Sequence, residues 1–177
     1  MNPATSLQIR RGNAADAETL SRCMADWFLA AYAHASDAAN TAAFVRSNFD
    51  PQKQARELAD PQIVTLIAQD GEDWAGYAQL RLATPTPDCV ARSDAAELGR
   101  FYFAPAQHGR GSAGQMMQAV RAEARARGRS WLWLLVWQEQ PQAIRFYEKQ
   151  GFEKVGTAIF MVGEDRKHDF VMCGEVG

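Results

Sequence analysis

The sequence predicts a single α/β domain built around a mixed β-sheet. The chain has 177 residues, the length of one ordinary domain. Strand and helix patterns follow one another in the order strand, helices, hairpin, strand, helix, strand, helix, strands, which is typical of this class. Residues 131–137, WLWLLVW, are almost wholly apolar, as expected of a strand buried on both faces. We therefore expect one domain spanning residues 1–177.

Composition excludes several classes of protein. Hydrophobic residues make up 47% and charged residues 23%, which is a globular and not a disordered composition. Nineteen basic against 21 acidic residues give a net charge of −2, which argues against a dedicated nucleic-acid binder. The three cysteines, Cys23, Cys89 and Cys173, are too far apart for a zinc motif or a disulfide framework, so no metal is expected.

The hydropathy pattern predicts a cytoplasmic protein that does not enter a membrane. The longest apolar run, residues 131–137, is far shorter than the roughly 20 residues of a membrane helix. The first 20 residues lack the apolar core of a signal peptide.

The N-terminal half predicts one strand, three helices and a hairpin. Apolar residues from Leu20 to Ala31 recur at three- and four-residue spacing, which indicates a helix. Asp50-Pro51 can begin a helix, because Asp accepts hydrogen bonds from free N–H groups and Pro suits the first helical position. Asp70-Gly71 is a hairpin turn signal. The expected elements are a strand at 7–10, helices at 16–32, 38–46 and 51–58, and strands at 63–68 and 74–82.

The C-terminal half alternates strands and helices after a loop at 83–95. Met116, Met117, Val120 and Ala124 continue a core-facing stripe that begins at Ala113. Gly128 then ends this helix. The remaining expected elements are strands at 97–103, 131–137, 152–160 and 169–173, and a helix at 141–150.

The most informative segment is the glycine-rich turn at 108–114, between a strand and a helix. A helix N-terminus carries unpaired N–H groups and a partial positive charge, so it can bind an anion. Glycine also lets the backbone approach a phosphate closely. Residues 108–129 contain five arginines and one glutamate, which favours a phosphorylated ligand.

The glycines permit more than one interpretation. Gly109, Gly111 and Gly114 spell GxGxxG, and Glu139 follows at roughly the distance of a ribose ligand, as in a dinucleotide site. Too few residues remain for a Rossmann fold, and Pro105 separates strand from turn. An ATP-binding P-loop pattern is absent from the turn. A plain glycine turn before a helix remains possible at this point.

Two segments resemble the GCN5-related N-acetyltransferase (GNAT) superfamily. His108, Gly111 and Ala113 fit its pyrophosphate loop, Gln/Arg-x-x-Gly-x-Gly/Ala, with His in place of Gln or Arg. Residues 134–152 fit its V-x-x-x-N-x-x-A-x-x-x-Y-x-x-x-G-F signature, with Gln140 in place of Asn. The matching positions of this second segment are Val136, Ala143, Tyr147, Gly151 and Phe152.

Within the superfamily, the C-terminal half is most similar to bacterial PaiA-type polyamine N-acetyltransferases. The residues that carry this similarity are Trp137, Phe160, Gly163, Asp169 and Met172.

The resemblance implies a mostly antiparallel mixed sheet flanked by helices, in which two strands splay apart to hold acetyl-CoA. It implies transfer of an acetyl group from acetyl-CoA, the co-substrate, to a primary amine. Backbone groups of Phe101 and Phe103 would bind the pantetheine arm, and Gln140 would contact it. The pyrophosphate would be held by the loop residues His108, Gly109, Arg110, Gly111, Ser112 and Ala113.

The resemblance also assigns Tyr147 the role of proton donor to the leaving thiolate. A phenol with an ordinary pKa near 10 is protonated at neutral pH and can donate. A plain core aromatic is the alternative for this residue. Glu97 is the best-placed candidate base, although an exposed carboxylate at a strand end fits it equally well. No cysteine suggests a covalent intermediate, so we expect direct transfer in a ternary complex.

The acceptor is expected to be a small amine, and a polyamine is the first choice. Its pocket should form from the N-terminal helices, the 83–95 loop and the late strands. The candidate lining residues are Trp27, Tyr32 and Tyr102, with Asp26, Glu97 and Glu164 as carboxylates. Transfer to a peptide or protein amine, or a non-catalytic acyl-CoA-binding module, are the alternatives. A homodimer is possible.

Overall fold

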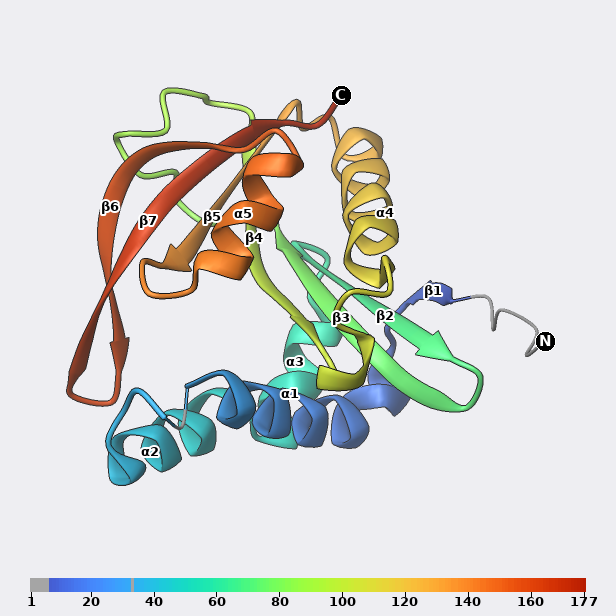
Figure 1. The fold of residues 1–177 in the computed structure, drawn as a ribbon. Helices are drawn as coiled ribbons and strands as arrows, with labels where there is room; N and C mark the ends of the chain where they lie inside the picture. Colours follow the sequence, from blue (N-terminus) through green and yellow to red (C-terminus); the bar gives the residue numbers. More distant parts are fainter. Residues whose placement is uncertain (1–6, 33) are drawn as a thin grey trace.

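A seven-stranded sheet organises the molecule in the computed structural model, which describes residues 7–32 and 34–177 (Figure 1). The strand order across the sheet is β1-β2-β3-β4-β5-β7-β6. The strands are β1 (Gln8–Arg11), β2 (Ile63–Asp70), β3 (Asp73–Arg81), β4 (Ala95–Phe103), β5 (Trp131–Trp137), β6 (Glu153–Val162) and β7 (Asp165–Glu175). The helices are η1 (Ala14–Asp16), α1 (Ala17–Tyr32), α2 (Ala38–Asn48), α3 (Pro51–Ala59), η2 (Pro105–Gln107), α4 (Ser112–Ala126) and α5 (Pro141–Lys149).

Hydrogen-bonded pairing between strands is interrupted near the centre of the sheet, between β4 and β5. Strands β4 and β5 are parallel, whereas every other pair among the described strands is antiparallel. They pair over only three positions, from Ala95 opposite Trp131 to Glu97 opposite Trp133. Beyond these positions the two strands diverge (Figure 1). The predicted fold class, a mixed and mostly antiparallel sheet with a splayed pair, is confirmed.

A β-bulge lies at the point of divergence. Leu80 of β3 faces Leu98, and Gln79 faces Arg100, so Gly99 is an extra residue in β4. A bulge bends its strand and increases the local twist. A β-carbon at Gly99 would lie 3.0 Å from the Arg81 side chain, so glycine allows this close approach. The bulge therefore helps to turn β4 away from β5.

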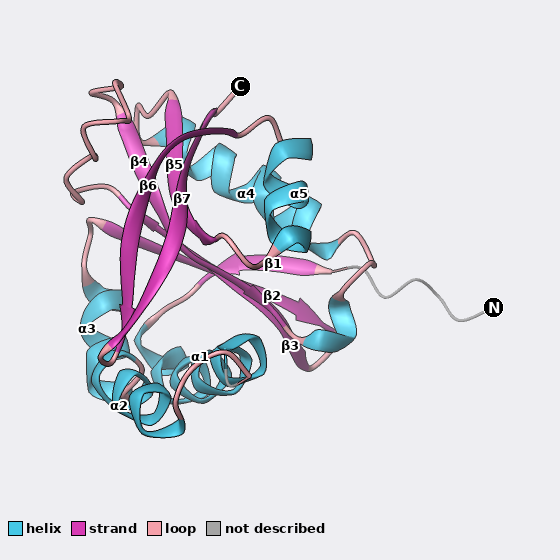
Figure 2. Ribbon diagram, turned by 60° about the vertical axis from the view of Figure 1, so that its left-hand side comes forward, coloured by secondary structure: helices cyan, strands magenta, loops and turns pink. Residues whose placement is uncertain are grey.

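Helices cover both faces of the sheet (Figure 2). Helices α4 and α5 lie on one face, where the predicted methionine stripe of α4 packs into the largest core cluster. Met116, Met117, Val120 and Ala124 are all fully buried there. Helices α1, α2 and α3 lie on the other face, where Leu20, Met24 and Phe28 form a second, aromatic-rich core cluster. Each face of the sheet thus has its own core.

Local sequence signals explain where the elements begin. Asp50 caps α3 through a 3.0 Å bond from the Lys53 N–H to its carboxylate, and Pro51 is the first helical residue. Gly71 turns the β2–β3 hairpin with φ of +67°. The predicted elements at 7–10, 16–32 and 169–173 correspond to β1, η1–α1 and β7, and they differ from these mainly at their ends. Pairing with neighbouring strands sets the ends of β1 and β7. No helix of the described residues is both long enough and apolar enough to cross a membrane.

Met117→Ala should destabilise the protein by about 2–5 kcal/mol, because it leaves a cavity in a fully buried position of the core. The matched control is Met161→Ala, since Met161 is 44% exposed on β6 and its truncation should cost less than about 0.5 kcal/mol. Urea denaturation of both variants measures the difference. Equal effects would contradict the assignment of the α4 stripe to the core.

Candidate functional site

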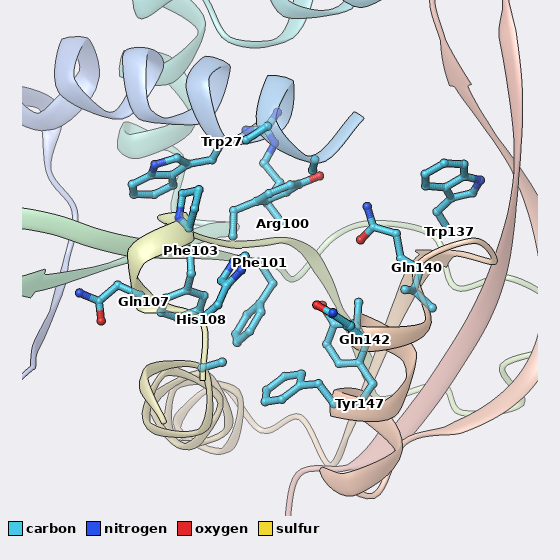
Figure 3. Close-up of a pocket in the computed structure, with 18 of the residues that line it drawn as sticks. Trp27, Arg100, Phe101, Phe103, Gln107, His108, Trp137, Gln140, Gln142 and Tyr147 are labelled. Atoms are coloured by element: carbon cyan, nitrogen blue, oxygen red, sulfur yellow. The ribbon is translucent and has the colours of Figure 1, made fainter. Parts of the chain in front are cut away.

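A cavity of about 530 Å³ opens where β4 and β5 diverge (Figure 3). The glycine loop before α4 forms one side, and the N-terminal part of α5 forms the other. Residues of α1 form the wall on the α1–α3 face of the sheet. Strands β4 and β5 supply the rest of the lining with edges that do not pair with each other there. The cavity is long, crosses the sheet, and is bordered by unused backbone hydrogen-bonding groups.

The glycine loop is shaped to bind an anion. Gly109 and Gly111 have φ of +77° and +83°, the left-handed conformation that glycine adopts without strain. No atom of the described residues lies within 4 Å of a β-carbon built on either residue. The N–H groups of Gly109, Gly111 and Ser112 have no acceptor within the described part of the chain. Together with the positive end of α4, these free donors make the loop suited to an anion.

Side chains of the same loop hold its shape. Ser112 donates a 2.8 Å hydrogen bond to Gln107, and Gln107 donates a 3.1 Å bond to Asp70 in the β2–β3 hairpin. Arg110 pairs with Asp70 at 3.5 Å and does not line the cavity. Of the predicted loop residues, His108, Gly109, Gly111 and Ala113 line the cavity (Figure 3). The Arg110 and Ser112 side chains therefore point to the hairpin and to Gln107.

Phe101 and Phe103 line the cavity from β4, as the sequence predicts. Phe101 also stacks on Phe146 of α5, with ring centroids 5.7 Å apart, across the gap between the two strands. Gln140 lies just before α5, and its side chain makes no capping hydrogen bond. Its amide is directed into the cavity together with that of Gln142, which the sequence analysis did not single out (Figure 3). Both amides are available to a ligand's polar groups.

Tyr147 is both a core residue and a cavity residue. Its ring is 8% exposed and packs edge-on against Phe146 and Phe152. It also lines the cavity, and its hydroxyl has no hydrogen-bond partner among the described residues (Figure 3). Burial raises the pKa of Tyr147, and the nearby Tyr102 raises it further. The hydroxyl is therefore a proton donor at neutral pH, and the two predicted roles are compatible.

A second cavity of about 180 Å³ lies beside the first near the divergence point. The two share Tyr32, Gly99, Arg100, Tyr102 and Leu135. Its other walls come from α1, α2, β3, β6 and β7, and aromatic residues make up almost half of its lining. The aromatic residues are Phe28, Tyr32, Phe44, Phe49, Tyr102 and Phe160.

Most charged groups of the second cavity are paired. Arg100 forms a 2.7 Å ion pair with Glu57. Arg81 donates two hydrogen bonds to Gln79. Glu97, the predicted base, lines this cavity and accepts a 2.7 Å hydrogen bond from Thr84. These contacts fix the three side chains in place.

Asp169 of β7 is the exception. It is 4% exposed, lines the second cavity, and its Oδ1 has no partner within the described part of the chain. Burial raises its pKa to about 7. The sequence analysis assigned no chemical role to it. The signal was its place in β7, because the two-residue period puts it on one face with the buried Val171 and Cys173.

Only some of the other residues predicted for the acceptor pocket line a cavity. Tyr32 and Tyr102 line both cavities, and Trp27 lines the first. Asp26 and Glu164 are exposed and line neither. Residues 83–95 also line neither, although Thr84 supports Glu97 from that loop. The carboxylates at the cavity are therefore Glu97 and Asp169.

Comparison with known proteins agrees with this fold. Residues 24–152 match the Acetyltransferase (GNAT) family. A relative in Mycobacterium bovis, named an uncharacterised N-acetyltransferase, is 34% identical over 91% of this chain and 98% of its own length. The chain belongs to the GNAT acetyltransferase family. The predicted enzyme class, an acyltransferase, is confirmed, and the dinucleotide interpretation of the glycines is wrong.

Solved structures support the same fold. The PaiA N-acetyltransferase of Thermoplasma acidophilum, solved with coenzyme A, superposes with a TM-score of 0.80 and 21% identity, covering 96% of this chain and 99% of that one. The yncA structure from Salmonella typhimurium, solved with acetyl-CoA, gives a TM-score of 0.74 and 17% identity, covering 97% and 95%. At these identities the likeness establishes the fold.

Gly111→Ala should destabilise the protein by about 1–2 kcal/mol, because alanine is strained at φ of +83°. Gly114→Ala is the matched control. Gly114 lies inside α4 with equal space around it, so alanine there should stabilise by about 0.5–1 kcal/mol. Denaturant unfolding compares the two. A stabilising Gly111→Ala would contradict the loop conformation.

Asp169→Asn should stabilise the protein at pH 8 but not at pH 4. A raised carboxyl pKa means that wild-type stability is full below the unfolded pKa near 4 and is lost as pH rises through about 7. Asparagine cannot ionise and avoids that loss, so the free energy of unfolding at pH 8 should rise by an amount on the order of a few kcal/mol. Thermal unfolding of both proteins from pH 4 to 8 measures it. Parallel stability curves would show that Asp169 is not desolvated.

Proposed function

We propose that this protein transfers an acetyl group from acetyl-CoA to a small primary amine, by direct attack within a ternary complex. The observation that carries the proposal is the meeting of two cavities at the β4–β5 divergence, with Tyr147 lining the first. One cavity is suited to a long phosphorylated molecule, and the other to a compact acceptor.

The first cavity fits acetyl-CoA in three respects. The free N–H groups of Gly109, Gly111 and Ser112 suit the pyrophosphate. The unpaired edge of β4 at Phe101 and Phe103 suits the amides of the pantetheine arm. The side chains of Gln140 and His108 face the cavity and can donate further hydrogen bonds. The thioester supplies the activated acetyl group when the co-substrate is bound.

Tyr147 is proposed as the acid for the leaving sulfur. Its hydroxyl is protonated, is not engaged by another described side chain, and belongs to the lining of the cavity. The Tyr147 ring is nearly buried among aromatic side chains, and such surroundings strengthen a hydrogen bond to a developing thiolate. Glu97 is proposed to influence the acceptor from the second cavity, where Thr84 holds its carboxylate.

A polyamine is the first choice among acceptors. The second cavity combines aromatic rings with the unpaired Asp169 carboxylate, and its two arginines are engaged by Glu57 and Gln79. This combination favours a cationic ligand over a neutral or anionic one. The fold likeness to the PaiA structure is compatible with this choice.

Wild-type protein should release CoA from acetyl-CoA in the presence of one amine class, and Tyr147→Phe should reduce kcat by at least about tenfold. The loss of a proton donor should affect kcat more than the affinity for acetyl-CoA. A thiol reagent measures CoA release with spermidine, spermine, simple diamines, amino acids and a lysine peptide. Acetyl-CoA binding is measured in parallel by calorimetry.

The outcomes separate the candidate functions. Turnover with the lysine peptide alone would replace the small amine by a protein acceptor. Tight acetyl-CoA binding without turnover would favour a non-catalytic acyl-CoA-binding module. Absence of acetyl-CoA binding would contradict the assignment of the first cavity.

A further inference from the structure

The second cavity contains one buried carboxylate that no described residue pairs with. Arg81 and Arg100 are matched by hydrogen bonds or ion pairs to Gln79 and Glu57, and Glu97 is held by Thr84. The Oδ1 atom of Asp169 has no hydrogen-bond partner among the described residues, although the residue is only 4% exposed. A buried carboxylate without a partner is costly, so such a group is usually paired or bound to a ligand. Asp169 therefore has no cationic partner among the described residues.

The rings around Asp169 indicate what kind of cation fits. Phe28, Phe44, Phe49 and Phe160 line the same cavity and present apolar faces and π-electron density. An alkylammonium group beside a carboxylate, with its carbon chain against the rings, would satisfy both features. The volume of about 180 Å³ limits the buried part to a compact chain. The chemistry of the cavity is that of a primary ammonium site.

The position of Asp169 links this site to the acetyl donor. Asp169 faces Trp137 across the β5–β7 ladder, and Trp137 lines the first cavity. Tyr32 belongs to both cavities, and its pKa is raised well above 10 by burial and by the charges of Tyr102 and Asp169. Asp169 therefore lies at the acceptor side of the junction, opposite the cofactor side that Tyr147 occupies.

We propose that Asp169 binds the ammonium group of the acceptor and removes its proton, so that it is the general base of the reaction. The inference rests on the acetyl transfer proposed above. It assigns to a β7 residue the role that the sequence analysis considered for Glu97. Glu97 is less suited to that role, because it already accepts a hydrogen bond from Thr84 and lies on the same side of the cavity as Arg81 and Arg100.

The proton balance of the step is complete. One N–H bond of the ammonium breaks, and its proton goes to an Asp169 oxygen. The neutral amine nitrogen then bonds to the thioester carbonyl carbon, and the C–S bond breaks with its electron pair on sulfur. Tyr147 gives its proton to sulfur and regains one from the new amide nitrogen. Asp169 releases its proton to water as the product leaves, so one proton is produced per turnover.

Titration of Asp169 depends on a defined set of neighbours. Burial makes its pKa about 7, which is suited to a base that works at neutral pH. The pKa of Tyr102 is raised to about 12, so it stays neutral in this range. The charged and titratable groups that line the cavity or lie next to Asp169 are Tyr32 of α1, Arg81 of β3, Glu97, Arg100 and Tyr102 of β4, and Lys167 and His168 of β7.

The test compares Asp169→Asn with Glu97→Gln and with Glu153→Gln, a surface control on β6. Asp169→Asn should lower kcat/KM for the best amine by roughly 100-fold or more, with acetyl-CoA affinity unchanged. It should also remove the limb of the kcat/KM–pH profile that has an apparent pKa near 7. Asp169→Glu should recover part of the activity. Glu97→Gln should have a smaller effect, and Glu153→Gln none.

A binding measurement separates failure of this inference from failure of the proposed function. Calorimetry with butylammonium and CoA-loaded protein should show an affinity that Asp169→Asn lowers at least about tenfold. If wild-type protein acetylates an amine and Asp169→Asn does so equally well, the inference is overturned while the acetyl transfer stands. If no amine is acetylated, the proposed function fails. Loss of butylammonium binding in Asp169→Asn would then still support the ammonium site, and absence of binding to wild type would overturn it.

Discussion

The failure of β4 and β5 to stay paired is the constraint on which the rest of the structure depends. Three residue pairs hold the strands together, and the Gly99 bulge then turns β4 away. The separation leaves backbone groups free along both edges, and in a folded protein such groups need partners. Loops and helices cover the gap only partly, so a ligand can supply the missing contacts. The site is thus formed by an interruption of the sheet.

Desolvation raises the pKa of side chains on both sides of this interruption. Burial raises the pKa of Tyr147 and Tyr102 and keeps these phenols protonated. The same effect raises the pKa of Asp169 to about 7, where a carboxylate can both accept and release a proton near neutrality. A single physical cause therefore favours an acid on one side and a base on the other. The aromatic lining that excludes water is what produces it.

Many features were predictable because their signals are local. Asp70-Gly71 determines a turn through the backbone freedom of glycine, and Asp50-Pro51 begins a helix through capping. The spacing of the apolar residues from Met116 to Ala124 follows the period of an α-helix. The glycine loop and Tyr147 were found through family resemblance, and their placement in the first cavity agrees with it. Each of these signals lies within a short stretch of chain.

Other features required the folded chain, because they depend on residues far apart in sequence. Asp169 is unpaired because the arginines of its cavity, Arg81 and Arg100, are engaged by Gln79 and Glu57, and nothing near position 169 records that. Arg110 resembles a phosphate ligand in the sequence, yet Asp70 of a distant hairpin pairs with it.

The sequence by itself determined the fold class, the glycine loop and the family, since these follow from periodicity, turn chemistry and motif spacing. Tertiary structure alone decided which carboxylate is buried without a partner, because burial and pairing are properties of the assembled surroundings.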